Sequence, residues 1–357
     1  MLSMDITIGE KWKELKMADK QTVGFIGGKF LPFHMGHTYA ILSASNKVDE
    51  LYVVLSSSKN RDRELCERDG IKYIPSEVRL SWLGAAFRDL DNVKIVNVED
   101  DQWDYNYDWK EGARMIKQTI GKPIDFVFSS ETSYNVHFSK YYPEAKHVVI
   151  DEGRDIVPIS ATELRKNLYS NWDKLPTYVR SYFVKKVALV GTESCGKTTL
   201  AKKLSKFYNT NWVHEVGRDY CDKYKNQLTP AMFNLIGMEH FLLQAKKSEE
   251  SNKLLFVDSE SVITQYYLDM YFKNKFQLLE EIVKIQDYDL VLYLEPDVKW
   301  VDDGLRFAGE DNIRKLNNEK LKQMYKERGI NFVPISGDYS QRFDRARKLV
   351  DNLFVRK

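Results

Sequence analysis

The sequence has few cysteines, no long apolar segment and little excess of either charge. Its three cysteines, Cys66, Cys195 and Cys221, form no CxxC pair, so we expect neither a disulfide framework nor a zinc site, and a reducing cytosol fits. The longest apolar runs have the length of strands, too short to span a bilayer, and the N-terminus lacks the apolar core of a signal peptide. With 54 basic against 52 acidic residues, the charge gives no reason to expect a nucleic-acid partner. We therefore expect a soluble, cytoplasmic protein that binds neither membrane nor nucleic acid.

An alternation of apolar runs and longer stretches occurs twice in the 357 residues, a length that favours two domains. The strand-sized runs are 23–27, 50–56, 93–98, 125–129 and 146–151, then 186–191, 211–214, 253–258, 289–295 and 330–335. Most gaps between them are long enough for crossover helices, which indicates two α/β domains with parallel sheets of about five strands each. Residues 159–186 are predicted to be helical with a break near Pro176. We place the boundaries so that 1–20 is a leader, 21–183 the first domain and 184–357 the second.

A phosphate-binding motif follows the first predicted strand of the second domain. Residues 191–198, GTESCGKT, match G-x-x-x-x-G-K-[ST] at every fixed position. In such a loop the backbone N–H groups surround phosphates, the Lys197 amine lies near the β and γ oxygens, and the Thr198 hydroxyl can bind Mg²⁺. An ordinary glycine-rich turn is the alternative, but the strand before and the helix-like run after favour a nucleotide site. The predicted ATP contacts are Gly191, Glu193, Ser194, Cys195, Gly196, Lys197, Thr198 and Thr199.

Polar residues after later strands of the second domain are further candidates. Asp258 closes an apolar run, so its carboxylate is expected at the edge of the sheet where ligands bind. There it could hold Mg²⁺ or accept a proton from a hydroxyl nucleophile; a solvated turn aspartate is the alternative.

Two other segments follow strands in the same domain. Glu215, Arg218 and Asp219 either hold a substrate or cap the next helix. In WVDDGLR, residues 300–306, Gly304 and the paired aspartates suit a mobile lid, and Arg306 could neutralise charge on the transferring phosphoryl group. The alternative for this segment is an ordinary charged loop.

The first domain has an H-x-G-H motif directly after its first strand. His34 and His37 are three residues apart, on one face of a first helical turn. Backbone donors at a helix N-terminus together with two imidazoles suit triphosphate oxygens. A zinc site is not expected, because the other four histidines have no metal-ligand spacing. The predicted site residues are Gly27, Gly28, Lys29, Phe30, His34 and His37.

A second motif of the first domain, ISATELR, occupies residues 159–165. Ser160 and Glu163 have the spacing of a capping box, which requires no function. Thr162 and Arg165 lie on one face of the same helix start, where an anion would bind. The two interpretations are compatible, and the presence of H-x-G-H in the same domain favours an additional role in ATP binding.

These motifs resemble those of the H-x-G-H nucleotidyltransferase superfamily, with ISATELR similar to I-S-x-T-x-x-R. From about Thr22 onward the chain resembles the NadR-type bifunctional proteins, in which nicotinamide-nucleotide adenylyltransferase is fused to ribosylnicotinamide kinase. The segments that carry the resemblance are 28–37, 48–51, 127–131, 160–165, the phosphate loop and 300–306. The resemblance implies a Rossmann-like nucleotidyltransferase domain followed by a P-loop kinase domain.

The resemblance also implies two reactions. The second domain would transfer the γ-phosphoryl of ATP to nicotinamide riboside, and the first would join the resulting nicotinamide mononucleotide to the AMP part of ATP, giving NAD and pyrophosphate. The implied catalytic residues are His34, His37, Lys29 and Arg165 in the first domain and Lys197, Asp258 and Arg306 in the second. Mg²⁺ would assist both, with Thr198 and Asp258 as ligands in the kinase. Trp103 and Trp109 either stack on the nicotinamide ring or serve packing, and a homo-oligomer is compatible with the sequence.

Two alternatives remain open from the sequence. One is a pantetheine-phosphate adenylyltransferase fused to a dephospho-coenzyme A kinase, and the other is a protein that senses NAD or ATP. WVDDGLR favours the nicotinamide enzyme over the first, and the intact Lys197 and histidine pair favour an enzyme over the second. Some NadR-type proteins begin with a helix-turn-helix domain, but only about twenty residues precede the first predicted strand, so we expect no repressor role.

Overall fold

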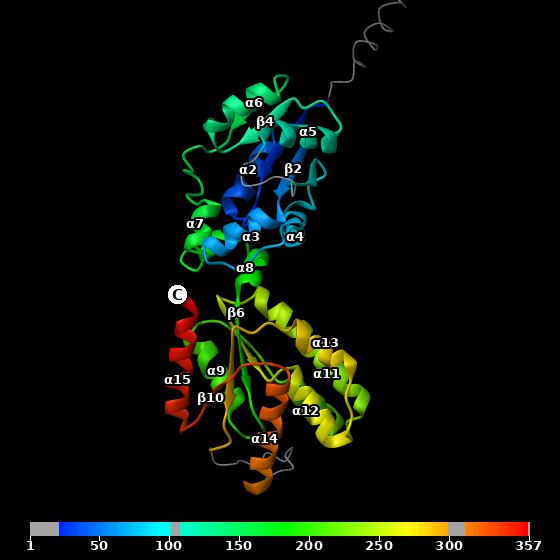
Figure 1. Cartoon of the computed structure of the whole chain (residues 1–357), viewed down its shortest axis with the longest axis vertical. Coiled ribbons are helices and arrows are strands. Elements are labelled where there is room, and N and C mark those ends of the chain that lie inside the picture. Colours follow the sequence, from blue (N-terminus) through cyan, green and yellow to red (C-terminus); the bar gives the residue numbers. More distant parts are fainter. Residues whose placement is uncertain (1–20, 101–107, 299–310, 356–357) are drawn as a thin grey trace, which may run out of the picture. The chain divides into compact units, whose positions relative to one another are not determined.

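The computed structural model describes residues 21–100, 108–298 and 311–355. The chain divides into two compact units, Met1–Val179 and Arg180–Lys357. Each unit contains a five-stranded sheet whose strands all pair in parallel, with helices between successive strands (Figure 1). The α/β class and the two parallel sheets predicted from the sequence are confirmed.

The sheet of the first unit has the strand order β3-β2-β1-β4-β5. Its strands are β1 (Val23–Gly28), β2 (Glu50–Ser57), β3 (Val93–Glu99), β4 (Phe126–Ser129) and β5 (Lys146–Val149). Its helices are α2 (Met35–Ser45), α3 (Lys59–Arg68), α4 (Ser76–Phe87), α5 (Trp109–Ile120), α6 (Asn135–Tyr141) and α7 (Ala161–Lys166). The direction of the chain across the sheet reverses between β1 and β4, which is where open α/β sheets bind ligands.

The sheet of the second unit has the order β10-β9-β6-β8-β7. Its strands are β6 (Lys185–Val190), β7 (Asn211–Val213), β8 (Leu254–Asp258), β9 (Leu290–Leu294) and β10 (Val333–Ile335). Its helices are α9 (Lys197–Phe207), α10 (Val216–Tyr224), α11 (Pro230–Glu249), α12 (Ser261–Phe272), α13 (Gln277–Ile285), α14 (Asp311–Glu327) and α15 (Tyr339–Asp351). The central strand β6 lies between β8 and β9, so the loop after it is flanked by the ends of both neighbours.

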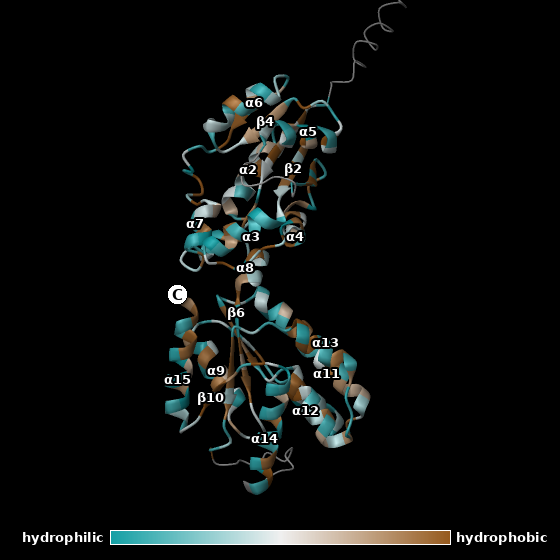
Figure 2. Ribbon diagram, viewed as in Figure 1, coloured by the Kyte–Doolittle hydropathy of each residue, from teal (hydrophilic) through white to brown (hydrophobic). Residues whose placement is uncertain are grey.

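Apolar side chains on both faces of these sheets explain why each strand is a continuous apolar run. In the second unit, Leu189 packs with α9 and α15 on one face. Its neighbour Val190 packs with Tyr266 of α12 and Tyr325 of α14 on the other. The strands of this unit are accordingly hydrophobic along most of their length (Figure 2).

The predicted helix over 159–186 is the element that the sequence predicted incorrectly. The structure has α7, a 3-10 turn at Trp172–Lys174 and the short helix α8 (Thr177–Phe183), and β6 begins at Lys185. Asn171 donates its side-chain N–H to the carbonyl of Asn167 at 3.0 Å. Such local bonds compete with helical ones, and Pro176 disfavours a helix at the residue before it.

No helix among the described residues is long and apolar enough to cross a membrane.

We expect the two halves to fold separately. A fragment ending at Phe183 and another beginning at Val184 should each retain secondary structure, because each unit has its own sheet and its own apolar core. Circular dichroism and a cooperative melting transition of each purified fragment would test this. Aggregation of both fragments would instead mean that they need a shared core.

Candidate active sites

The loop after β1 carries the H-x-G-H motif into α2. His34 is the N-cap of this helix, and its Nδ1 accepts a hydrogen bond from the Gly36 N–H at 3.1 Å. A Cβ at position 36 would lie 3.0 Å from the His34 ring, which explains why glycine separates the histidines. Phe30 has a φ of 47°, so the loop before the helix turns through the left-handed region.

The two histidines of this motif stack on one another. Their ring centroids are 3.7 Å apart, and Phe30 and Phe33 pack against His37. Burial and the nearby Arg154 charge lower the pKa of His34 to about 3, and burial, His34 and Arg154 lower the pKa of His37 well below its usual range. Both imidazoles are therefore neutral at physiological pH in the ligand-free chain, and each can donate one N–H.

Arg154 is a cation near this pair that belongs to none of the predicted motifs. It lies between β5 and α7, has a φ of 54°, and pairs with Glu131 at 3.3 Å. Its charge contributes to the low pKa of both histidines, so its positive charge acts on the same site. The only feature of the sequence that could have indicated Arg154 is its position after a strand end.

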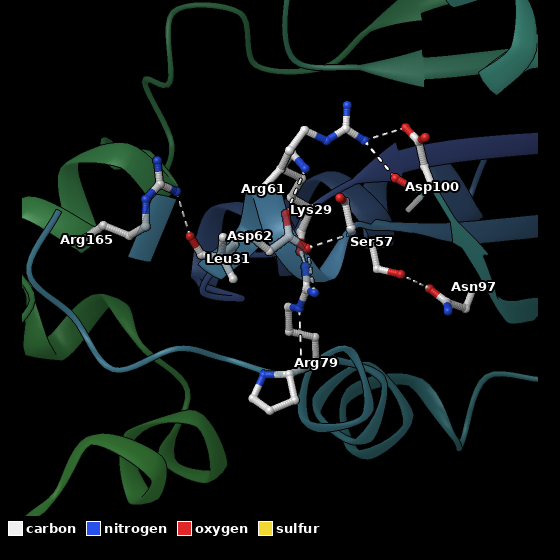
Figure 3. A network of polar contacts seen from close by, with 11 residues as sticks. Lys29, Leu31, Ser57, Arg61, Asp62, Arg79, Asn97, Asp100 and Arg165 are labelled. Atoms are coloured by element: carbon white, nitrogen blue, oxygen red, sulfur yellow. Dashed lines mark hydrogen bonds and ion pairs between the residues drawn. The ribbon is translucent and has the colours of Figure 1, made fainter. Parts of the chain in front are cut away.

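Lys29 belongs to a buried ion-pair network (Figure 3). Its Nζ donates to Asp62 Oδ1 at 2.8 Å, and the other oxygen of Asp62 accepts from Arg79 at 2.7 Å and from the Ser58 N–H at 3.0 Å. Burial alone would raise the pKa of Asp62, but the charges of Lys29 and Arg79 outweigh it and hold the pKa below its usual range. The Lys29 side chain remains 40% exposed, so its amine lies within reach of a ligand.

The ISATELR segment meets the H-x-G-H loop in space. Ser160 caps α7 by accepting from the Glu163 N–H at 3.1 Å, so a capping role is present. Arg165 is buried and donates to the Leu31 carbonyl at 2.8 Å (Figure 3). It also donates to Asp69 at 2.7 Å and to Thr162 at 3.1 Å. The structure thus shows Arg165 holding the loop before His34, and its direct contact with a phosphate remains a prediction.

Of the two tryptophans proposed to stack on nicotinamide, Trp103 lies outside the described residues. Trp109 begins α5 and stacks on the His137 ring, with centroids 4.1 Å apart and planes 6° apart. Phe138 also meets Trp109 edge-on. One face of the Trp109 ring is therefore used for packing, and stacking of nicotinamide on its other face remains a prediction.

In the second unit, the loop between β6 and α9 has the backbone that phosphate binding requires. Gly191, Ser194 and Gly196 have φ values of 142°, 57° and 87°, and a Cβ at Gly191 would lie 2.6 Å from the Leu294 carbonyl oxygen. Lys197 is buried, and its Nζ donates to the carbonyls of Gly191 and Thr192 at 3.1 and 2.9 Å. The amine therefore crosses the loop at the position where phosphate oxygens bind.

Cys195 contributes to this loop differently from its neighbours. Its side chain is fully buried, belongs to the apolar core under the sheet, and donates to the Thr192 carbonyl at 3.0 Å. Only the backbone of Cys195 is thus available to a nucleotide, whereas the Thr199 side chain is exposed.

Asp258 ends β8 beside the phosphate loop. Its Oδ2 accepts from the Thr198 hydroxyl at 2.5 Å, and its buried Oδ1 has no hydrogen-bond partner in the described part of the chain. Burial, with the Glu215 carboxylate, raises the pKa of Asp258 to about 6. A free buried carboxylate oxygen beside a threonine hydroxyl fits Mg²⁺, which prefers oxygen ligands and takes few of them from protein. No cluster of three or more His, Cys, Asp or Glu that could hold a metal occurs among residues 21–100, 108–298 and 311–355.

A cavity opens from the phosphate loop toward α10, α11 and α12. Glu215 and Arg218 line it, whereas Asp219 pairs with His214 at 2.6 Å on the exposed surface and is not among the lining residues. Glu215 is the N-cap of α10 but makes no capping bond with its side chain, which favours a ligand role over capping. Residues 300–306, with Gly304 and Arg306, lie outside the described residues.

Aromatic residues of α12 form a wall of this cavity that the sequence did not single out. Tyr267 and Tyr271 line it, with ring centroids 5.9 Å apart and planes 14° apart. The only signal was their spacing of four residues, which places both side chains on one helix face.

Comparisons with known proteins agree with this arrangement. Residues 186–342 match the AAA domain family. The chain is 31% identical to the trifunctional NAD biosynthesis/regulator protein NadR of Escherichia coli K12, over 93% of this chain and 83% of that protein, and 30% identical to NadR of Salmonella typhimurium, over 94% and 84%. Crystal structures of NadR in complex with NR, and with NAD and AMP-PNP, share the fold, with TM-scores of 0.79 and 0.76 at 23% and 22% identity; each covers 94% of this chain and 97% of that one. With this identity to two relatives over nearly its whole length, the chain belongs to the NadR family.

Proposed function

We propose that the chain makes NAD in two ATP-dependent steps. The second unit phosphorylates nicotinamide riboside to nicotinamide mononucleotide, and the first joins the mononucleotide to the adenylyl group of ATP, releasing pyrophosphate. The observation that carries this proposal is the position of two motif loops in one chain. The H-x-G-H loop follows β1 and the G-x-x-x-x-G-K-T loop follows β6, each at the carboxyl edge of its own parallel sheet. Family membership supports the nicotinamide enzyme over the fusion for coenzyme A synthesis.

In the kinase unit, the loop amides and Lys197 hold the β- and γ-phosphates of ATP, and the 5′-hydroxyl of the riboside attacks the γ-phosphorus. Bound Mg²⁺ would neutralise charge on the β and γ oxygens, with Thr198 and Asp258 as its protein-side ligands. The alternative role for Asp258 is to accept the proton that the hydroxyl loses, because its pKa in the metal-free chain, about 6, lies near neutral pH. We propose that Arg306 adds a further positive charge at the transferring group.

The cavity beside the loop suits the riboside, whose pyridinium ring carries a positive charge. The Tyr267 and Tyr271 rings offer aromatic surface, and Glu193 and Glu215 line the same cavity. Cations bind favourably over aromatic faces and beside carboxylates. Arg218 lines the cavity as well, and its donors suit hydroxyl or phosphate oxygens.

In the first unit, a phosphate oxygen of the mononucleotide attacks the α-phosphorus of ATP, and pyrophosphate leaves. No covalent enzyme intermediate is needed, so the protein acts by alignment and by stabilising charge. His34, His37, Lys29 and Arg154 form the cationic and hydrogen-bonding side of the site. Arg165 supports it through the Leu31 carbonyl. Gly27, Gly28, Phe30, Ser160 and Thr162 complete the proposed ATP contacts.

The proposed function is tested by offering the purified chain alternative acceptors with ATP and Mg²⁺. We expect phosphorylation of nicotinamide riboside and adenylylation of nicotinamide mononucleotide, with little reaction of dephospho-coenzyme A or pantetheine phosphate. Preference for the latter pair would refute the proposal in favour of coenzyme A synthesis. Nucleotide binding without turnover of any acceptor would instead favour a sensor.

The kinase step should lose activity in acid. Because the pKa of Asp258 is raised to about 6, its carboxyl becomes protonated as the pH falls through that value, and it can then neither accept a proton nor bind Mg²⁺. We expect kcat/KM for the riboside to fall about tenfold per pH unit below that value. Rates measured at several Mg²⁺ concentrations across this range would test it, because bound Mg²⁺ lowers the pKa of its carboxylate ligand and should move the acid limb to lower pH. The Asp258→Asn variant should be slow with no acid limb. A wild-type rate that stays constant down to pH 5 at the lowest Mg²⁺ concentration would contradict this role.

We also predict that the chain does not bind DNA as a repressor, although its relatives are named regulators. Residues 1–20 lie outside the described part of the chain, and the two units are α/β domains. Gel-shift experiments at physiological salt should show no sequence-specific complex with promoters of NAD-synthesis genes, with or without NAD. A complex at nanomolar protein that resists competitor DNA would overturn this prediction.

A further inference from the structure

Each unit contains an almost fully buried arginine whose donors end on the backbone of its phosphate loop. Arg79 is 0% exposed and Arg342 is 2% exposed. The two lie on different helices, α4 and α15. Neither belongs to the motifs that identify the two sites.

Arg79 holds the loop after β1 at Lys29 by two routes (Figure 3). Its Nη1 donates to the Lys29 carbonyl at 2.8 Å, and its Nη2 donates to Asp62 at 2.7 Å. The other oxygen of Asp62 accepts from the Lys29 amine at 2.8 Å. The main chain and the side chain of Lys29 are therefore both fixed through the Arg79–Asp62 pair.

Arg342 holds the loop after β6 in a comparable way. Its Nη1 donates to the Cys195 carbonyl at 2.6 Å, its Nη2 to the Glu295 carbonyl at 2.8 Å and its Nε to the Gly337 carbonyl at 2.7 Å. Asp297 pairs with the same guanidinium and accepts from the Gly337 N–H. One side chain thus joins the phosphate loop to the segments that follow β9 and β10.

The geometry of the peptide unit gives these contacts a consequence for catalysis. In a trans peptide the C=O and the following N–H point in opposite directions. Fixing the Lys29 carbonyl therefore fixes the direction of the Phe30 N–H, and fixing the Cys195 carbonyl fixes the Gly196 N–H. Amides of a phosphate loop act only if they point at the phosphates before these arrive.

Stability alone is a weak reason to bury an arginine. Removing a guanidinium from water is costly, and apolar replacements of buried ion pairs are often neutral or stabilising. The five donors of arginine lie in one rigid plane, whereas lysine offers its donors from a single point. At both positions the planar guanidinium group binds a carbonyl and a carboxylate at the same time.

We propose that Arg79 and Arg342 are positioning residues, which set the amide directions of the adenylyltransferase loop and of the kinase loop respectively. The proposal deepens the proposed function and rests on it. Both side chains are buried and donate to loop carbonyls, so each acts through the loop that it holds. Each should therefore affect the reaction of its own unit and leave the other reaction unchanged.

The test replaces each arginine by lysine in the full chain, which keeps the charge but removes the fork. In Arg342→Lys, we expect kcat for riboside phosphorylation to fall at least about tenfold per folded molecule, with adenylyl transfer within about twofold of wild type. In Arg79→Lys we expect the reverse pattern. The folded fraction of each variant is measured by circular dichroism at the assay temperature. Partial unfolding alone would lower the apparent kcat only in proportion to the folded fraction.

Matched controls come from arginines that pair with a carboxylate away from both loops. Arg114 pairs with Glu111 in the first unit, and Arg328 pairs with Glu280 and donates to the Met324 carbonyl in the second. Lysine at either position should leave both reactions within about twofold of wild type. If Arg342→Lys fails to fold, Asp297→Asn replaces it as the test variant, because Asp297 is 40% exposed; it should also slow the kinase selectively.

The proposal would be overturned if kcat, calculated per folded molecule, were the same in the variant as in wild type. It would also be overturned if a variant lost both reactions equally. Lack of turnover by the wild-type chain would refute the proposed function instead. Calorimetric titration of AMP-PNP into wild type and into Arg342→Lys would then decide the positioning role in the second unit. An affinity at least about tenfold weaker in the variant would support it, and an unchanged affinity would overturn it.

Discussion

Replacing Lys197 by alanine should slow phosphorylation of nicotinamide riboside at least ~100-fold, because the change removes the positive charge that lies across the phosphate loop. In the structure the Lys197 amine is held between the Gly191 and Thr192 carbonyls, where an incoming phosphate would meet it. Adenylyl transfer should change little, since its ATP site belongs to the other unit. Initial rates of both reactions on one preparation provide the measurement.

Lys206 gives a matched control for this experiment. It is an exposed lysine on the same helix, α9, so Lys206→Ala removes an equal charge without reaching the loop. Both reactions should stay near wild type in that variant. Comparable loss of both activities in a folded Lys197→Ala protein would show that the two sites are not independent.

Replacing His37 by alanine should have the mirror-image effect, lowering NAD formation from nicotinamide mononucleotide at least ~100-fold while riboside phosphorylation continues. His37 stacks on His34 with 3.7 Å between ring centroids, and burial keeps its pKa well below the usual range. The imidazole is therefore neutral in the ligand-free chain, and we expect it to act on ATP as a hydrogen-bond donor. Its importance should grow in the transition state, when negative charge develops on the leaving pyrophosphate.

The measurement is the initial rate of NAD release, compared with riboside phosphorylation by the same preparation. The second rate serves as the control for protein quality, because the kinase loop lies in the other unit. A folded His37→Ala protein that makes NAD at the normal rate would show that the histidine pair is structural.

Much of the fold was predictable because both sheets are parallel and covered on both faces. Such strands are continuous apolar runs, as in β2, where six successive residues from Glu50 are buried. All ten strands of the described residues lie at predicted positions, to within a few residues at their ends. The turns after Lys166 were mispredicted, because asparagine side chains there compete with the helix for backbone groups.

Parts of the candidate sites could not have been found in one sequence. Asp62 lies in α3, whose residues are mostly charged, and Arg79 lies in the more apolar α4. Only tertiary packing shows that both are buried beside Lys29. Arg154 reaches the histidine pair from a loop 117 positions beyond His37. Motifs revealed the loops that surround phosphates, whereas the residues that hold those loops are set by packing between distant segments.

The central claim is that one chain makes NAD from nicotinamide riboside at two independent ATP sites. The most direct test mixes Lys197→Ala with His37→Ala and supplies riboside, ATP and Mg²⁺. Neither variant alone should make NAD at more than about 1% of the wild-type rate. Together they should make it readily, because His37→Ala produces the mononucleotide that Lys197→Ala then adenylylates. A mixture that makes no more NAD than the separate variants would contradict the account.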